Sequence, residues 1–391
     1  MTTTTAEPDT GSWAGTPDLF AAARWDGQHD GAVTVDDAGT VLVAGGADAS
    51  GAAVKQSAYY DPADLKWHAT GTLDTARRLH TLTPIGNGMV LATGGLGAGG
   101  TPLATVELYD PTNHSWTRLT NPMGQARWGH SAALLPDGTV LVAGGSAIRA
   151  GSTVHALRSA EIFHPDDKTW QPAAGLTDAR TGHTAISLHG GAVLVCGGTA
   201  PVGTAEDPAL AFCELYDFGG KKWTPTGSLL HARSHHQATR LTDRTVLITG
   251  GLAPGAPAGG PFDPFSQRTA ERFDLDAGTW SRAKDMPSGR ALHRAVALDD
   301  GTVLVVGGAA SDRDEAGYRS AVLYDPGSTP GGDSWTPVAG LAEGRYAFAA
   351  ARSGGNVLVA SGVTRSGLAA ADPAVTELTT TAELFTPGSH P

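Results

Sequence analysis

A short apolar run that ends in small residues recurs along the chain about every 50 residues. Its seven copies are VLVAGG ending at Gly46, VLATGG at Gly95, VLVAGG at Gly145, VLVCGG at Gly198, VLITGG at Gly251, VLVVGG at Gly308 and VLVASG at Gly362. Each run is strand-sized and rich in β-branched residues, and the glycines that follow it favour a turn. The period predicts one repeat protein of seven units rather than two or three unrelated domains.

Each unit carries further aromatic positions at regular places. A Tyr or Phe follows each apolar run, at Tyr60, Tyr109, Phe163, Tyr216, Phe273, Tyr324 and Phe385. Six of these precede a tryptophan, at Trp67, Trp116, Trp170, Trp223, Trp280 and Trp335, and a seventh, Trp13, lies near the start of the chain. Four strand-like runs per unit, bounded by Gly, Pro and Asp, predict a four-stranded antiparallel sheet. Seven such sheets arranged radially would bury the aromatic side chains between them.

Through the double glycine, the Tyr-Asp-Pro and the spaced tryptophan, the chain resembles the kelch repeat family. The resemblance spans Trp13 to Pro387 and implies an all-β, seven-bladed kelch-type β-propeller. The last repeat departs from the pattern, because Ser361-Gly362 replaces the double glycine and Thr386 replaces Asp. We expect the last blade to be closed by the N-terminal strand around Trp13, because an open ring would expose two sheet edges. Residues 1–12 are expected to be a flexible tail, 13–387 a single propeller, and 388–391 a C-terminal tail.

The length of the loops differs between the two faces of such a ring. If the strands of each blade are called A to D from the pore outwards, the B–C loops and the D–A connections open on one face. The A–B and C–D turns are short, whereas the B–C loops run over residues 96–105, 252–269 and 363–381 in three different blades. Length variation on one face of a repeat protein is typical of a binding face. We therefore predict the functional site at the mouth of the central channel on this face.

Two rings of polar residues are expected at this mouth. A repeated arginine occurs at Arg24, Arg77, Arg127, Arg180, Arg233, Arg290 and Arg345, and a histidine follows three residues later at His80, His130, His183, His236 and His293. Trp13 precedes Arg24 by eleven residues, as Trp116 precedes Arg127. Five blades offer a glutamate at the start of strand C, at Glu107, Glu161, Glu214, Glu271 and Glu383, which predicts structural Arg–Glu pairs. Ala58 and Val322 stand there in the other two, and Arg24, Arg290 and Arg345 are candidate ligand-binding residues.

The position directly after each repeated arginine breaks the symmetry. It holds Trp25, Arg78, Trp128, Thr181, Ser234, Ala291 and Tyr346 around the ring. Aromatic side chains placed singly beside an added arginine suit a flat or apolar ligand with an anionic group. Trp25, Arg78 and Trp128 are therefore candidate ligand-binding residues. The alternatives are that the tryptophans pack under neighbouring loops and that Arg78 is a solvated surface arginine.

Candidate catalytic residues lie beside the same positions. The first blade carries a two-residue expansion that places Asp26 near His29, and His235 is an extra histidine beside the repeated His236. An Asp and a His within reach of each other act as orienter and base. Asp26, His29, His235 and Tyr346 are the catalytic candidates.

Composition excludes several classes of partner. The net charge of −12 and the 17% of charged residues argue against a nucleic-acid footprint and against disorder by charge repulsion. No apolar stretch approaches the roughly 20 residues of a membrane helix. Met1–Thr10 is Thr-rich and lacks the basic start and apolar core of a secretory signal, which predicts a cytoplasmic protein. Arginine outnumbers lysine 21 to 6, a bias typical of a high-GC bacterial genome such as that of an actinobacterium.

The chemistry-bearing residues favour neither a metal nor a cofactor. Cys196 and Cys213 are expected to be buried thiols in neighbouring strands, where a cross-strand pair is geometrically possible. Neither is placed for the Cys–Tyr cross-link that the copper oxidases of the kelch superfamily need. Glu107, Asp110 and His114 are similar to the iron motif of the plant kelch specifier proteins, but the spacing is one residue short. No Gly-rich loop precedes a helix, which argues against a nucleotide cofactor.

Kelch propellers include both partner-binding modules and enzymes. A chain that is all propeller, with a symmetry-broken aromatic mouth, resembles the kelch enzymes that isomerise, cyclise or eliminate without a redox cofactor. Our first interpretation is a monomeric, small-molecule-binding propeller, a cofactor-independent isomerase, cyclase or lyase of bacterial biosynthetic metabolism. The alternative is a non-catalytic scaffold that binds a protein partner through its B–C loops.

Overall fold

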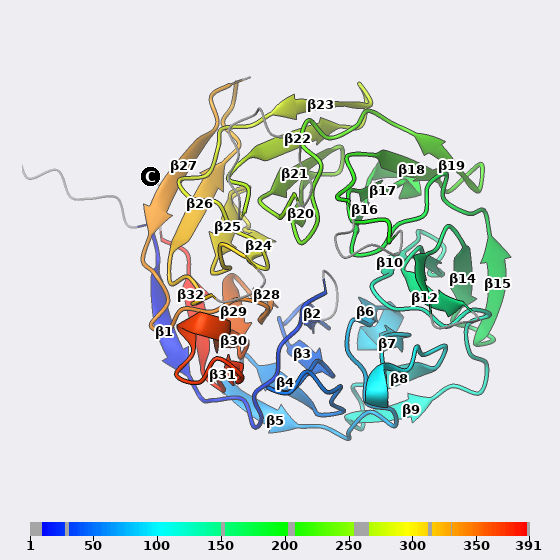
Figure 1. Ribbon diagram of the computed structural model, residues 1–391, viewed down its shortest axis with the longest axis horizontal. Helices are drawn as coiled ribbons and strands as arrows, with labels where there is room; N and C mark the ends of the chain where they lie inside the picture. Colours follow the sequence, from blue (N-terminus) through cyan, green and yellow to red (C-terminus); the bar gives the residue numbers. More distant parts are fainter. Residues whose placement is uncertain are drawn as a thin grey trace, which may run out of the picture.

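The computed structural model describes residues 10–27, 31–149, 153–201, 208–253, 266–311, 315–329 and 331–388. In this part of the chain, seven four-stranded antiparallel sheets stand radially around a central axis (Figure 1). The predicted seven-bladed propeller is confirmed. None of the short helical turns in the described residues has the length or the apolar character to cross a membrane.

The blades follow one another in chain order, with strands A to D running from the axis outwards. Blades 1 to 3 consist of β2 (Ala32–Thr34), β3 (Val41–Ala44), β4 (Ser57–Asp61) and β5 (Lys66–Ala69); β6 (Thr81–Pro84), β7 (Val90–Thr93), β8 (Val106–Asp110) and β9 (Ser115–Arg118); and β10 (Ser131–Leu134), β11 (Val140–Ala143), β14 (Ala160–His164) and β15 (Thr169–Ala173). Blades 4 to 6 consist of β16 (Thr184–Ser187), β17 (Val193–Cys196), β18 (Cys213–Asp217) and β19 (Lys222–Pro225); β20 (Gln237–Thr242), β21 (Thr245–Thr249), β22 (Ala270–Asp274) and β23 (Thr279–Arg282); and β24 (Arg294–Ala297), β25 (Val303–Val306), β26 (Ala321–Asp325) and β27 (Ser334–Val338).

The seventh blade joins the two ends of the chain. It contains β28 (Ala349–Ser353), β29 (Asn356–Ala360), β32 (Ala382–Thr386) and β1 (Ser12–Thr16), with Trp13 opposite Phe385. The rings of Trp13 and Phe385 lie 5.1 Å apart, and the Trp13 indole donates a hydrogen bond to the Ala339 carbonyl. The predicted closure by the N-terminal strand is confirmed. Residues 1–9 and 389–391 of the two expected tails lie outside the described residues.

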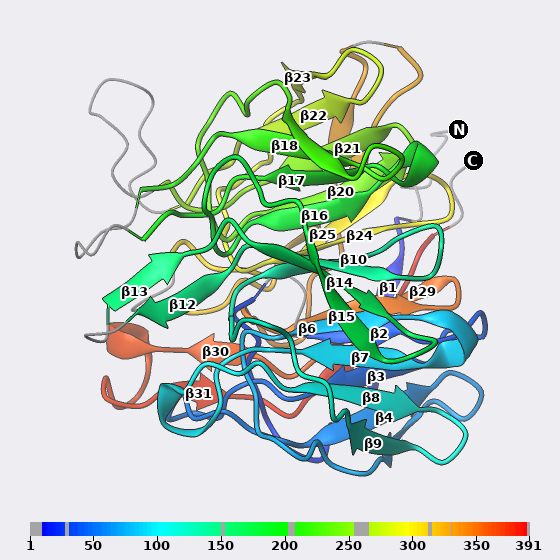
Figure 2. The ribbon, with the colours of Figure 1, turned by 90° about the vertical axis from the view of Figure 1, so that its right-hand side faces the viewer.

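The loops between the blade strands contain smaller elements. Two hairpins arise within B–C loops, β12 (Ser146–Arg149) with β13 (Thr153–Ala156) in blade 3, and β30 (Val363–Arg365) with β31 (Glu377–Leu378) in blade 7. Four 3₁₀ turns complete the described elements: η1 (Gly86–Gly88), η2 (Ala98–Gly100), η3 (His189–Gly191) and η4 (Gly367–Ala369). Figure 2 shows both hairpins on the same side of the ring.

The core lies between blades, which explains the repeat. The B strands are buried throughout because neighbouring blades cover both of their faces. One cluster joins Leu91 and Val106 of blade 2 to Val140, Val142 and Phe163 of blade 3. The aromatic pair of each blade stacks across strands C and D, as Tyr109 does opposite Trp116. A single blade has no such partner for its apolar faces, so the ring is the unit that buries them.

The double glycine allows neighbouring blades to approach closely. Gly94 and Gly95 both have positive φ, and the Gly95 N–H donates to the Arg127 carbonyl of the next blade. A Cβ at Gly94 would lie 2.6 Å from that oxygen. In blade 7, Ser361 adopts the same conformation, with φ of 58°. Its hydroxyl accepts the Ala23 N–H and lies 2.8 Å from the Ala23 carbonyl oxygen, so it joins blade 7 to the entry of blade 1.

Ser361→Ala should lower the free energy of unfolding by about 1 to 3 kcal/mol, because the buried Ala23 N–H would lose its acceptor. Urea unfolding of the two proteins measures the difference. Ser50→Ala is a suitable control, since the Ser50 hydroxyl contacts only an exposed loop carboxylate, Asp48. Equal stability of Ser361→Ala and the parent protein would contradict a role of this hydroxyl in ring closure.

Candidate functional site

The repeated arginines form buried ion pairs. Arg77 donates to Glu107 at 2.5 Å and to the carbonyl oxygens of Gly94 and Thr105. Glu107 in turn accepts the N–H of Asp74 from the D–A connection. The same pair recurs in the five blades where a glutamate is available: Arg77–Glu107, Arg127–Glu161, Arg180–Glu214, Arg233–Glu271 and Arg345–Glu383. The predicted pairing is confirmed. Each of these arginines links strands B and C of its blade to the D–A connection that leads into that blade.

Two of the ligand-binding candidates are buried within their blades. Arg345 is fully buried and contacts Ser361, Thr381 and Glu383. Arg290 is also fully buried, with Val322 where five other blades have a glutamate. Its guanidinium donates to the Ser320 carbonyl and lies 5.8 Å from the ring centre of Tyr318. Burial lowers the pKa of Arg290 to about 10. A ligand would reach neither side chain without rearrangement of the blade.

In the first blade, the residue at the position of the repeated arginine is Ala23, one residue before the predicted Arg24. In six blades, the second glycine of the preceding blade donates to the carbonyl of the repeated arginine, whereas Gly362 donates to Ala23. Arg24 forms an isolated β-bridge with Ala47, just as Arg78 does with Leu96 in the next blade. Arg24 therefore occupies the variable position that follows the repeated arginine. The prediction of a repeated arginine in all seven blades is therefore wrong: Ala23 takes its place. In five of the six other blades, the repeated arginine follows the tryptophan by ten residues. Ala23 follows Trp13 by the same ten residues, a spacing that indicates Ala23 at the repeat position.

This correction changes the composition of the mouth. The variable ring is Arg24, Arg78, Trp128, Thr181, Ser234, Ala291 and Tyr346. Trp25 is only 2% exposed, packs in the cluster between blades 1 and 7, and contacts Gly46 as His80 contacts Gly95. Arg24, Arg78 and Trp128 enter consecutive blades and are all partly exposed. They are the members of the predicted ligand set that solvent reaches.

The histidine ring joins the blades. His183 Nε2 lies 2.8 Å from the Ser131 hydroxyl of the preceding blade, and His236 Nε2 lies 3.0 Å from that of Thr184. All five repeated histidines are buried. Burial lowers the pKa of His80 and of His293 well below the usual range, which keeps both rings neutral. Four of the five form hydrogen bonds between neighbouring blades: His130, His183, His236 and His293.

The described catalytic candidates also contact the fold around them. The Asp26 carboxylate lies 3.6 Å from Arg24 Nε, and the buried Tyr346 hydroxyl donates to Ser366 at 2.6 Å. His235 Nδ1 lies 3.2 Å from the Ser234 hydroxyl. His29 lies outside the described residues. Each described candidate therefore has a local partner of its own.

Backbone hydrogen bonds between consecutive blades rim the mouth, a feature that the sequence analysis missed. Trp25 N–H donates to the Ala347 carbonyl, Ala347 N–H to Leu292, and Leu292 N–H to His235. On the other side, Gly182 N–H donates to Gly129. The positive φ of Leu79, His235, Leu292 and Ala347, and of the glycines at 129 and 182, marks the same backbone turn at the entry to blades 2 to 7. The glycines at this position were the available signal.

An unpredicted arginine lies inside the channel. Arg294, the first residue of β24, donates to the carbonyl oxygens of Phe348, Gly27 and Trp25. It lines a cavity of about 80 Å³ together with Gln237 and Ala350. The position after the repeated histidine holds Thr or Ser in blades 2 to 4, so this arginine is another break in the repeat. It joins blade 6 to blade 7 and to the entry of blade 1.

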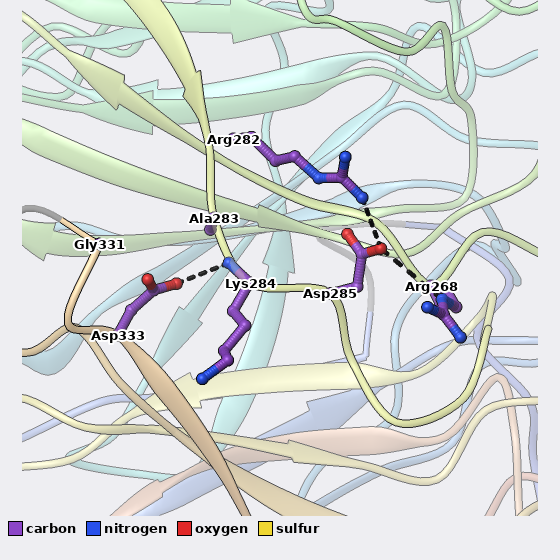
Figure 3. Close-up of a pocket in the computed structure, with 7 residues that line it drawn as sticks. All are labelled: Arg268, Arg282, Ala283, Lys284, Asp285, Gly331 and Asp333. Carbon is purple, nitrogen blue, oxygen red and sulfur yellow. Dashed lines mark hydrogen bonds and ion pairs between the residues drawn. The ribbon is translucent and has the colours of Figure 1, made fainter.

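A larger pocket of about 470 Å³ lies at the outer edge between blades 5 and 6 (Figure 3). Arg282 and Arg268 share the carboxylate of Asp285, at 2.8 and 3.6 Å. Asp333 accepts the backbone N–H of Lys284 at 2.6 Å. The Lys284 side chain extends away from Asp285 in Figure 3. None of the predicted site residues that the structure describes lines this pocket.

Exposed apolar side chains gather on the face of the B–C loops. Nine large apolar side chains among the described residues are strongly exposed, and seven lie in B–C loops or D–A connections: Phe20, Ile148, Val154, Phe212, Leu230, Leu368 and Val375. Leu65 and Leu134 are the other two. Ile148 and Val154 are direct cross-strand partners on the β12–β13 hairpin and are 45% and 39% exposed. These seven side chains lie on the face formed by the B–C loops and D–A connections, which we call the B–C face.

Trp128→Ala should change the free energy of unfolding by no more than about 1 kcal/mol, because the indole is partly solvated and lies outside the inter-blade clusters. Trp67→Ala, which removes a buried repeat tryptophan, is the matched comparison and should destabilise severely. Urea unfolding measures both. Equal losses would place Trp128 in the core and remove it from the accessible mouth.

Fold and repeat define a β-propeller with a buried Arg–Glu pair in five blades and with double glycines where neighbouring blades meet. Residues 77–123 match the Kelch motif family. The chain is 30% identical to beta-scruin of Limulus polyphemus over 173 residues, which are 44% of this chain and 18% of scruin. It is 30% identical to human Kelch-like protein 34 over 214 residues, 54% of this chain and 30% of that protein. The chain is a kelch-repeat β-propeller.

Two further likenesses are more distant. The yeast tRNA wybutosine-synthesizing protein 4 is 27% identical over 273 residues, 65% of this chain and 37% of that protein. The chain thus spans less than two fifths of these three curated relatives. A solved fungal alcohol oxidase of the AA5 family, in complex with copper, has a TM-score of 0.70 at 18% identity and covers 97% of this chain and 76% of its own. That likeness shows the fold alone.

Proposed function

We propose that this propeller is an interaction module that binds a protein partner through its B–C face. The observation that carries the proposal is the gathering of seven strongly exposed large apolar side chains on that face. Exposure of such apolar surface to water costs free energy. That free energy is regained when a partner covers the surface. The repeat supplies a rigid ring, and the loops that differ between blades supply the specific contacts.

The β12–β13 hairpin is the centre of the proposed contact. Ile148 and Val154 form one β-branched surface because they are paired across the two strands. Covering a side chain of this size fully contributes about 1.5 to 3 kcal/mol. Leu368 on η4, 81% exposed, offers a second anchor on the same face. Two anchors in different blades would fix the orientation of a partner.

The contacts of the mouth residues favour this function over catalysis. Asp26 and Tyr346 interact with Arg24 and Ser366, contacts that hold the local fold. Arg290 and Arg345 are enclosed within their blades. The interaction module is therefore our first proposal, and a ligand site at the mouth is the second.

Affinity capture from cells of the source organism tests the proposal. The double variant Ile148→Asp/Val154→Asp should capture at least about tenfold less of a specific co-purifying protein than the parent protein does, because two carboxylates replace the apolar pair. The double variant Leu65→Asp/Leu134→Asp alters the two strongly exposed leucines outside the B–C face and should keep this protein. Retention of the same partner by both variants would contradict a contact through the hairpin.

A small-molecule site at the mouth is supported by Arg78 and Trp128. Their side chains form no ion pair and no side-chain hydrogen bond within the described residues. A flat anionic ligand could stack on the indole and meet the guanidinium. Benzoate and indole-3-acetate should raise the unfolding temperature of the protein but not of Arg78→Ala, which should itself fold normally. Identical shifts in both proteins would remove Arg78 from the site.

A further inference from the structure

The two cysteines face each other across blade 4. Cys196 ends β17 and Cys213 begins β18, and the two are direct cross-strand partners. Both are buried free thiols. The same pair of positions holds Ala44 and Ser57, Thr93 and Val106, Ala143 and Ala160, Thr249 and Ala270, Val306 and Ala321, and Ala360 and Ala382 in the other blades. The cysteines are therefore specific to blade 4 and are not required by the repeat.

Their place in the sheet suits a disulfide. The Gly197 N–H donates to the Phe212 carbonyl, which makes the neighbouring Cys196–Cys213 pair a non-hydrogen-bonded one. The Cα atoms of such pairs are about 4.5 Å apart, which lies within the roughly 4.4 to 6.8 Å that disulfides span. The backbone can thus accept the bond without a change of register.

We propose that Cys196 and Cys213 form an oxidation site that a hydroperoxide converts to a cross-strand disulfide. One thiolate attacks the peroxide, breaks the O–O bond and becomes a sulfenic acid, and one water is released. The second thiolate attacks that sulfur and displaces a second water as the S–S bond forms. Overall, the two thiols lose two protons and two electrons, and these reduce one hydrogen peroxide to two waters. The oxidant must be small because both sulfurs are buried.

Burial also sets the rate of this reaction. Desolvation by burial, together with the neighbouring Cys213 thiol, raises the pKa of the Cys196 thiol well above its usual range. Little thiolate is present at neutral pH, so the native protein should react slowly. The pair is thus a site that sustained oxidation modifies.

The disulfide would close the base of one B–C loop. Residues 197–212 leave the sheet at Cys196 and return at Cys213, and the exposed Phe212 of the B–C face stands directly beside the bond. Oxidation would fix both ends of this loop to each other. The bond itself does not depend on the proposed partner, so its test is independent of the test of that function.

The full chain is freed of reductant, incubated with hydrogen peroxide, quenched with catalase and unfolded in the presence of N-ethylmaleimide. Both cysteines lie in the tryptic peptide 181–221. We expect that peptide to lose two hydrogen atoms and to bind no maleimide, while the protein stays monomeric on a non-reducing gel. Dithiothreitol should restore two reactive thiols. The unfolding temperature should rise on oxidation and return on reduction.

Cys196→Ser and Cys213→Ser are the matched controls and should show neither the mass loss nor the change in unfolding temperature. Refolding the urea-unfolded chain in a glutathione redox buffer tests the same bond with both thiols accessible at the start. Two free thiols in that refolded monomer would overturn the proposal. So would addition of oxygen to each sulfur separately in the peroxide-treated protein.

Discussion

Removal of residues 1–16 should destabilise the propeller by about 5 kcal/mol or more, because it deletes a whole strand together with a packed tryptophan. β1 pairs with β32 along its full length, and Trp13 covers Phe385. Without β1, β32 becomes an exposed edge strand that can pair with another chain. Urea unfolding measures the loss, and light scattering measures the expected association.

Removal of residues 1–9 is the control for this truncation, because these residues precede β1. The shorter truncation should leave the unfolding midpoint unchanged. A protein lacking residues 1–16 that melts like the full chain would contradict closure of blade 7 by the N-terminal strand.

Arg77→Ala should lower the free energy of unfolding by about 3 to 5 kcal/mol, because Glu107 would remain buried without its cation. Both side chains are fully enclosed, and the guanidinium also satisfies the Gly94 and Thr105 carbonyl oxygens. Glu107→Ala should cost a similar amount by leaving the guanidinium without an anion. Urea unfolding of both variants provides the values.

The double variant Arg77→Ala/Glu107→Ala should be less destabilised than the sum of the two single variants, because neither charge is then left alone. Blade 1 already carries this combination, with Ala23 and Ala58 at the two positions. Additive losses in the double-mutant cycle would show that the two groups do not stabilise each other.

The fold was predictable because it depends on a pattern that repeats seven times. Each double glycine, Tyr and Trp contributes the same contact in its blade, so the period alone indicates the sheet, the ring and the closing strand. The Arg–Glu pairs were predictable for the same reason, since a glutamate stands at one place in five blades. The entry to blade 1 was misplaced because two adjacent residues, Ala23 and Arg24, compete for one repeat position.

The site was harder to predict because it depends on where the repeat is broken. Sequence alone does not separate an odd residue that packs inward, such as Trp25, from one that solvent reaches, such as Trp128. Arg294 is odd in the same way, yet it bonds three carbonyl oxygens inside the channel. The exposed apolar side chains of the B–C face were not predicted, because their exposure depends on the course of loops that differ from blade to blade.

Site-specific photo-cross-linking tests most directly whether the B–C face binds a protein. A benzophenone amino acid is placed at Ile148 in one protein and at Leu65 in another, and each is irradiated in cells of the source organism. The account predicts a discrete adduct of higher mass from position 148 and none from position 65. An adduct from position 65 alone, or none from position 148 in folded protein, would contradict it.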